Sequence, residues 1–136
     1  MIMRPLLFIL AVLAAACPAL AHDPSGYWAR EAQAGRAPPA EWWKSLHAPN
    51  GGIPCCDIAD GQRVEDVDWD TQRGEDGKPR YRVRLIGKWI DVPDDAVIDE
   101  PNRYGPAVVW PVFADDGEGH HVAVAFIRCF LPGAGA

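Results

Sequence analysis

From residue 62 onward, hydrophobic and polar residues alternate along the chain, which is the pattern of half-buried β-strands. The clearest run is 80–85, where charged and bulky side chains take turns without a break. Four further runs lie between turn-forming Gly, Pro and Asp residues, at 64–69, 88–92, 108–113 and 122–130. Pro111 interrupts the run at 108–113, so we expect a sheet edge or a bulge there. The pattern predicts about five short strands in an antiparallel sheet.

Two of these runs can pair as a β-hairpin in a register that gives favourable side-chain partners on both faces. Pairing 64–70 with 80–85 places three aspartates opposite three arginines, as Asp70–Arg80, Asp68–Arg82 and Asp66–Arg84. The same register places apolar residues together on the other face, as Trp69–Tyr81 and Val67–Val83. A slip of one residue would exchange the two faces, so we expect this register around a turn at 75–78.

The segment before residue 62 has helical rather than alternating spacing. Pro38 and Pro39 are tolerated in a first helical turn, and 42–46 supplies an apolar face before Pro49–Gly52 ends the helix. Residues 22–37 allow one or two loose helical turns at most. The expected fold class is α+β, mainly β, with an N-terminal helix followed by a small antiparallel sheet or a partly closed SH3-like barrel.

The first 21 residues read as an export signal. Arg4 precedes an apolar run from Pro5 to Ala16, and Ala19–Ala21 is a small-x-small cleavage site. The apolar run is too short to span a membrane. An alternative is a lipoprotein, in which Cys17 after Ala14–Ala16 would carry the lipid anchor. We expect a periplasmic or secreted protein that begins at His22.

The predicted organisation is a signal peptide over 1–21, an N-terminal extension over 22–37, one domain over 38–132 and a flexible tail over 133–136. Without the leader the chain has 115 residues, enough to bury a core of its own. It carries 12 basic and 19 acidic residues, a net charge of −7. This acidic balance argues against nucleic acid or anionic lipid as a partner.

Three cysteines remain after the leader is removed: Cys55, Cys56 and Cys129. An oxidising compartment favours a disulfide, and a bond between the adjacent pair would be strained. We therefore expect a long-range bond to Cys129, from Cys56 by a small preference and from Cys55 as the alternative. It would close a loop of 73 or 74 residues and stabilise the fold by about 4 kcal/mol. Cys129 is in phase with Ile127, so we expect both to face inward.

Two short motifs resemble a group of small exported alphaproteobacterial proteins of unknown function. The motifs are Cys55-Cys56-Asp57-Ile58-Ala59-Asp60 and Arg128-Cys129-Phe130-Leu131-Pro132. The group has CC-x-x-x-D-C near the start of its sheet and RCF-x-P near its C-terminus. This chain has Gly61 where the group has a third cysteine. The resemblance implies export and a disulfide, but no catalytic activity.

The side chains that could bind a metal follow no recognised zinc spacing. The candidates are His22, His47, Cys55, His120 and His121. Adjacent residues on a strand point to opposite faces, so His120 and His121 are poorly placed to share an ion. As a new N-terminus, His22 could chelate Cu(II) through its amine and imidazole. We expect no cofactor.

The six tryptophans are the remaining unusual feature. Trp89 is out of phase with Ile90, and the adjacent Trp42 and Trp43 cannot both face one core from a helix. These three tryptophans are the predicted binding surface, for a protein or glycan of the cell envelope.

No nucleophile or phosphate-loop motif is present, so we expect no enzyme. The sequence favours a non-catalytic binding or structural module of the periplasm or cell envelope. The alternative is a periplasmic metal-binding or thiol-redox protein that uses Cys55 or Cys56 with a histidine.

Overall fold

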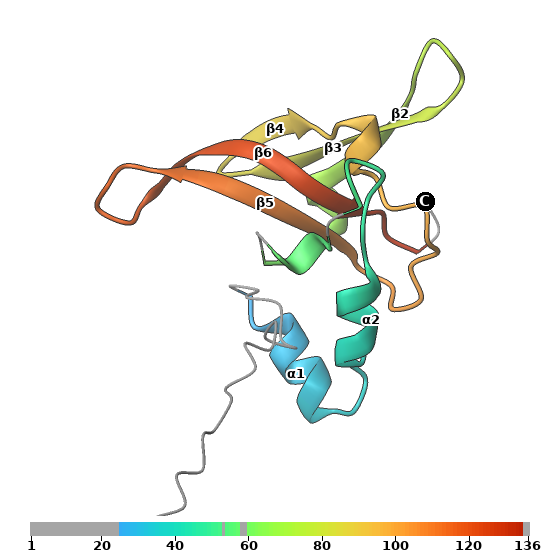
Figure 1. Ribbon diagram of the computed structural model, residues 1–136, viewed down its shortest axis with the longest axis vertical. Coiled ribbons are helices and arrows are strands. Elements are labelled where there is room, and N and C mark those ends of the chain that lie inside the picture. Colours follow the sequence, from blue (N-terminus) through green and yellow to red (C-terminus); the bar gives the residue numbers. More distant parts are fainter. Residues whose placement is uncertain (1–24, 53, 58–59, 135–136) are drawn as a thin grey trace, which may run out of the picture.

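The computed structural model describes residues 25–52, 54–57 and 60–134 (Figure 1). Two short helices come first, α1 (Tyr27–Gln33) and α2 (Ala40–Ser45). Three 3-10 turns follow at intervals: η1 (Cys55–Asp57), η2 (Asp66–Asp68) and η3 (Asp94–Ala96). The strands are β1 (Gln62–Val64), β2 (Trp69–Arg73), β3 (Pro79–Leu85), β4 (Lys88–Asp91), β5 (Ala107–Asp115) and β6 (His121–Leu131).

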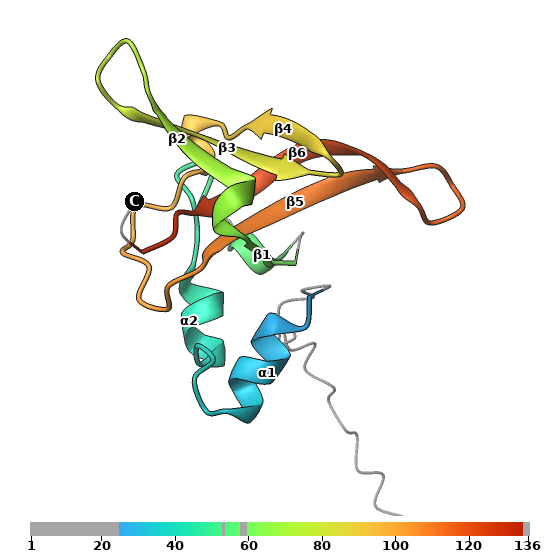
Figure 2. The same ribbon diagram turned by 180° about the vertical axis from the view of Figure 1, so that it is seen from behind.

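The strands form two antiparallel sheets, ordered β1-β5-β6 and β2-β3-β4. The two views show β3 and β4 on one side of the β5–β6 ribbon and the two helices on the other (Figures 1 and 2). Two buried clusters fill the spaces between these layers. One lies between the helices and the first sheet and includes Trp28, Trp43, Trp110, Cys129 and Leu131. The other lies between the sheets and includes Val64, Val83, Val109, Ile127 and Phe130.

The mainly β class is confirmed, whereas the SH3-like barrel of about five strands is not. Over the described residues there are six strands in two separate sheets and no closed barrel. The difference begins at 64–69, which we expected to be one strand. Asp68 N donates to Glu65 O at 2.8 Å and closes a 3-10 turn there. The turn sends β1 to β5 in one sheet and β2 to β3 in the other.

The β2–β3 register differs from the expected one by two residues. Asp70 lies opposite Arg82, and Trp69 lies opposite Val83. Gly74 N donates to Lys78 O at 2.8 Å, and Gly77 has a φ of 77°, so the turn is tight. Strands β2 and β3 therefore begin to pair directly after it, at Arg73 and Pro79. Because the shift is even, each side chain keeps its predicted face.

Strand β6 is bulged, and one bulge changes the face of a cysteine. Trp110 pairs with Cys129, but the next residue, Pro111, pairs with Ile127, which leaves Arg128 as the extra residue. The bulge expected near Pro111 is therefore confirmed. The prediction that Cys129 and Ile127 share a face is wrong, because the extra residue reverses the alternation of side chains. Cys129 lies in the cluster beside the helices, and Ile127 lies in the cluster between the sheets.

Residues on either side of the predicted domain, 38–132, also contact the rest of the fold. Trp28 of α1 is 2% exposed and meets Trp43 edge-on, with ring centroids 5.2 Å apart. At the other end, Gly133 is buried and Ala134 N donates to Gly105 O at 2.8 Å. The predicted leader and His22 lie outside the described residues. No helix in the described ranges is both long and apolar enough to cross a bilayer.

Candidate binding surface

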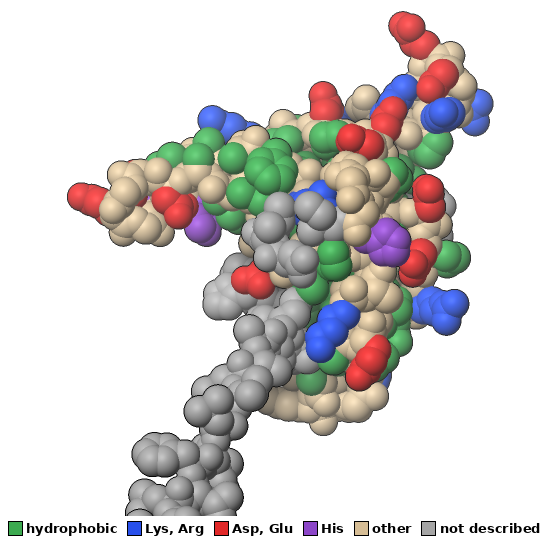
Figure 3. Space-filling view, in the orientation of Figure 1, with side chains coloured by type: hydrophobic (Ala, Val, Ile, Leu, Met, Phe, Trp, Pro, Cys, Tyr) green, Lys and Arg blue, Asp and Glu red, His purple; other side chains and the backbone are tan. Residues whose placement is uncertain are grey.

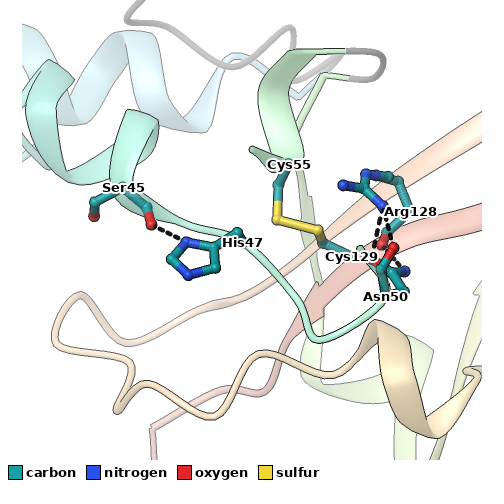
Figure 4. The surroundings of a disulfide bond; sticks show 6 residues. All are labelled: Ser45, His47, Asn50, Cys55, Arg128 and Cys129. Carbon is teal, nitrogen blue, oxygen red and sulfur yellow. Dashed lines mark hydrogen bonds between the residues drawn. A yellow bond between two sulfur atoms is a disulfide. The ribbon is translucent and has the colours of Figure 1, made fainter. Parts of the chain in front are cut away.

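The disulfide joins Cys55 to Cys129, with an S–S distance of 2.05 Å and Cα atoms 5.8 Å apart (Figure 4). Cys55 was the alternative partner, so the preference for Cys56 is wrong. Cys55 N donates to Leu46 O at 2.9 Å, and this hydrogen bond fixes the start of η1 with Cys55 fully buried. Cys56 lies outside the disulfide and is half-buried. As a disulfide sulfur, Cys55 cannot serve as a thiolate metal ligand.

Beside the disulfide, Arg128 and Asn50 bind each other (Figure 4). Arg128 Nη1 donates to Asn50 O at 3.2 Å and to Asn50 Oδ1 at 2.6 Å, while Asn50 Nδ2 donates to Arg128 O at 2.8 Å. Arg128 is only 5% exposed, and these oxygens accept hydrogen bonds from its buried guanidinium. We did not expect this pair from the sequence. Its one local signal is the position of Arg128 next to Cys129.

Gly61 packs against the indole of Trp110. A Cβ atom at this position would lie 2.8 Å from Trp110 Cε2, closer than real side chains allow. The ring therefore fills the space that a side chain at position 61 would need.

Among the described histidines, His47 lies apart from His120 and His121. His47 Nδ1 lies 2.7 Å from Ser45 O, and its ring is exposed (Figure 4). At the β5–β6 turn, His120 Nδ1 contacts Asp116 Oδ2 at 2.8 Å, whereas His121 Nδ1 contacts Asp115 Oδ1 at 2.5 Å. The two neighbouring histidines thus have separate carboxylate partners.

Asp116 also organises the turn that carries His120. Its carboxylate accepts hydrogen bonds from Glu118 N at 2.8 Å and His120 N at 3.2 Å. The Glu118 amide, and after it the His120 side chain, lower the pKa of Asp116 below its ordinary value. Potential ligand atoms of Asp116, Glu118 and His120 lie within 4.8 Å of one another, but all three residues are exposed. Exposed acidic turns of this kind are common without an ion, and the hydrogen bonds explain the geometry.

Two of the three tryptophans expected at a binding surface serve the interior instead. Trp43 is 5% exposed and packs between Trp28 and Trp110, so its assignment to a binding surface is wrong. Trp42 is half-buried and meets Tyr104 edge-on at 4.7 Å. The loop that carries Tyr104 covers Trp42, which is how adjacent residues of one short helix can both be packed.

Trp89 is the exposed member of the three, with 43% of its surface accessible. It lies on the outer face of β4, opposite Arg84 of β3. The guanidinium carbons of Arg82 and Arg84 lie 4.8 and 5.8 Å from the centroid of its ring. Both distances are within the range of cation–π attraction, so two arginines hold the indole in place.

The two arginines are held in turn by aspartates. Arg82 donates to Asp70 Oδ2 from Nε at 3.1 Å and from Nη2 at 2.7 Å. Arg84 Nε donates to Asp68 Oδ1 at 2.6 Å. The sequence predicted an aspartate–arginine ladder here, although with different partners. Arg80 instead pairs with Asp76 and Asp94.

A strained turn lies next to Trp89. Ile86 and Gly87 join β3 to β4, with φ values of 49° and 71°, as in type I′ hairpin turns. A β-branched residue is unfavourable at positive φ, and Ile86 is 48% exposed, so little packing compensates for it. The strained turn could have been recognised in the sequence, because two-residue hairpin turns normally carry Asn, Asp or Gly where this chain has Ile86.

We call this group of side chains the Trp89 surface. Its members are Asp68, Asp70, Arg82, Arg84, Ile86 and Trp89. Hydrophobic side chains are visible on the side of the molecule formed by β4 and β6 (Figure 3). The Trp89 surface exposes the side chains of Ile86 and Trp89 next to two arginines, each of which forms an ion pair with an aspartate.

Comparison of the chain with protein-family models, with curated proteins and with solved structures finds no match. The resemblance to small exported alphaproteobacterial proteins therefore stays a prediction from two motifs.

Proposed function

We propose that this protein is an exported, non-catalytic binding module whose Trp89 surface docks onto a protein of the cell envelope. The observation that carries the proposal is the exposed Trp89 ring, held by Arg82 and Arg84, which are themselves bound to aspartates. Tryptophan and arginine are the residue types most enriched at the energetic centres of protein interfaces. Side chains that are already ordered lose little conformational entropy on binding.

The turn favours a protein partner over a glycan. Ile86 offers no hydrogen-bonding side chain to sugar hydroxyls, and the arginines beside it already have carboxylate partners. A strained and exposed isoleucine is kept most readily where it contributes apolar contact in a complex. A glycan remains a distinct outcome of the test below.

Two features support the location. The sequence predicts an export signal over 1–21, and the Cys55–Cys129 disulfide is of a kind that persists in oxidising compartments. The alternative, a metal-binding or thiol-redox protein, has less support. Cys55 is committed to the disulfide, and His120 and His121 each face their own carboxylate.

The test is photo-crosslinking in cells of the native host, with a photoreactive amino acid in place of Lys88. Lys88 is exposed and lies between Ile86 and Trp89. We expect one protein adduct of defined mass, lost in Trp89→Ala and Ile86→Asn but kept in Val67→Ala. Val67 is 74% exposed in η2 and serves as the matched apolar control. The proposal is overturned if all four proteins give the same adducts, or if only glycan fragments are captured.

A further inference from the structure

A second feature of the fold is a cleft beside the C-terminal segment, which we call the C-terminal cleft. It has a volume of about 740 Å³ and is lined by the start of β3, the segment after β4 and the residues that follow β6. Ligand sites in proteins usually measure roughly 300–1,000 Å³, so this cleft is large enough to bind several groups of a ligand.

Hydrogen bonds to β6 and its extension hold the walls of the cleft. Ile98 N donates to Phe130 O at 2.9 Å, and Asn102 Nδ2 donates to Pro132 O at 3.0 Å. Asn50 N donates to Asp95 O at 3.0 Å, which fixes Pro49 at the rim of the cleft. These hydrogen bonds tie the segment after β4 to β6, to the residues that follow β6 and to the loop that carries Pro49. The cleft is therefore preformed, which reduces the entropic cost of binding.

The lining combines apolar and acidic groups. Its apolar part consists of Val97, Ile98, Tyr81 and several prolines: Pro49, Pro79, Pro101 and Pro132. Tyr81 is fixed by its ring contact with Phe130, with centroids 5.4 Å apart. These groups offer a surface for an aliphatic chain rather than for a compact polar molecule.

The charges around the cleft are unequal. Three carboxylates line it, those of Asp94, Asp99 and Glu100, against one ammonium group, that of Lys78. Asp94 is already paired with Arg80. Asp99 and Glu100 are exposed and adjacent, and together they outweigh Lys78. The remaining negative charge favours a cationic ligand.

We infer that the C-terminal cleft binds a basic peptide segment, in which the aliphatic stem of a lysine or arginine lies against the apolar lining and its cationic group meets Asp99 and Glu100. Lysine and arginine side chains combine these two properties, since their stems are apolar and their ends are charged. The inference is independent of the Trp89 surface, which lies on the outer face of β3 and β4.

The test uses the disulfide-bonded protein and an acetylated, amidated tetralysine peptide at low ionic strength, with calorimetry for affinity and amide NMR shifts for location. We expect binding with shifts confined to the lining residues. The double variant Asp99→Asn/Glu100→Gln should weaken it by at least about tenfold. The control Asp66→Asn/Glu118→Gln makes the same charge change at exposed acids that do not line the cleft, and should bind like the wild type.

Three outcomes would overturn the inference. Equal weakening by both double variants would show general charge attraction, and spermidine binding as tightly as the peptide would show a small-amine site. Absence of peptide binding to a protein with a native unfolding transition would also reject it. Trp89→Ala should bind tetralysine normally, so failure of the C-terminal cleft and failure of the Trp89 surface can be told apart.

Discussion

Cys129 and Ile127 face opposite layers of the protein, although only Arg128 separates them on β6. The bulge at Arg128 turns three successive side chains toward three different parts of the fold. Arg128 binds Asn50, Cys129 bonds to Cys55, and the Phe130 ring contacts Tyr81. This short segment therefore joins the N-terminal loop, the helix-side cluster and the inter-sheet cluster.

Arg128→Ala should lower the free energy of unfolding by about 2–4 kcal/mol, because it leaves the Asn50 oxygens without their buried donor. Denaturant unfolding followed by tryptophan fluorescence measures the change. Arg36→Ala is the control, since Arg36 forms an exposed ion pair with Glu31 and should matter little. Similar losses in the two variants would contradict the structural role of Arg128.

The double variant Cys55→Ser/Cys129→Ser should lose about 4 kcal/mol of stability, because the bond closes a loop of 74 residues. Cys56→Ser should keep the bond and most of the stability. Denaturant unfolding gives the energies, and peptide mapping without reduction identifies the linked cysteines. A map that links Cys56 to Cys129 would overturn the pairing.

Ile86→Asn should raise the free energy of unfolding by about 0.5–1 kcal/mol, because asparagine tolerates positive φ better than a β-branched residue. The same variant should lose its partner if the proposed function is right, so stability and binding should change in opposite directions. Val67→Asn removes an exposed apolar side chain without this backbone effect and should give no gain. A loss of stability in Ile86→Asn would show that the turn is not strained.

Asp116→Asn should reduce the thermal stability of the protein at neutral pH but not in acid. The pKa of Asp116 is lowered in the folded state, first by the Glu118 amide and then by His120, so its ionised form stabilises the fold. That contribution is complete above the ordinary value of 3.8 and disappears as the pH falls through the lower folded pKa. Melting temperatures from pH 2 to 7 should therefore converge at the acid end. A constant difference across this range would contradict the assignment.

The sequence was sufficient for features that depend on neighbouring residues. Alternation along 80–85 and 88–92 predicted β3 and β4, since a strand with one buried face must alternate. The phase of Trp89 against Ile90 predicted that one of them is exposed, and the structure exposes Trp89 more. Pro111 predicted a sheet edge or a bulge, because it has no amide hydrogen to donate to the ladder, and the structure has the bulge.

Only the tertiary structure decided which distant groups meet. Alternation assigns a face but not a partner strand, so it could not divide β1 and β2 between two sheets or choose between registers two residues apart. Adjacent Cys55 and Cys56 look equivalent until the hydrogen bond to Leu46 O orients the first toward Cys129. Likewise, Trp43 is buried because Trp28 and Trp110 arrive from elsewhere in the chain. Local pattern determines which side chains need a partner, whereas the packing of the layers determines which partner each one finds.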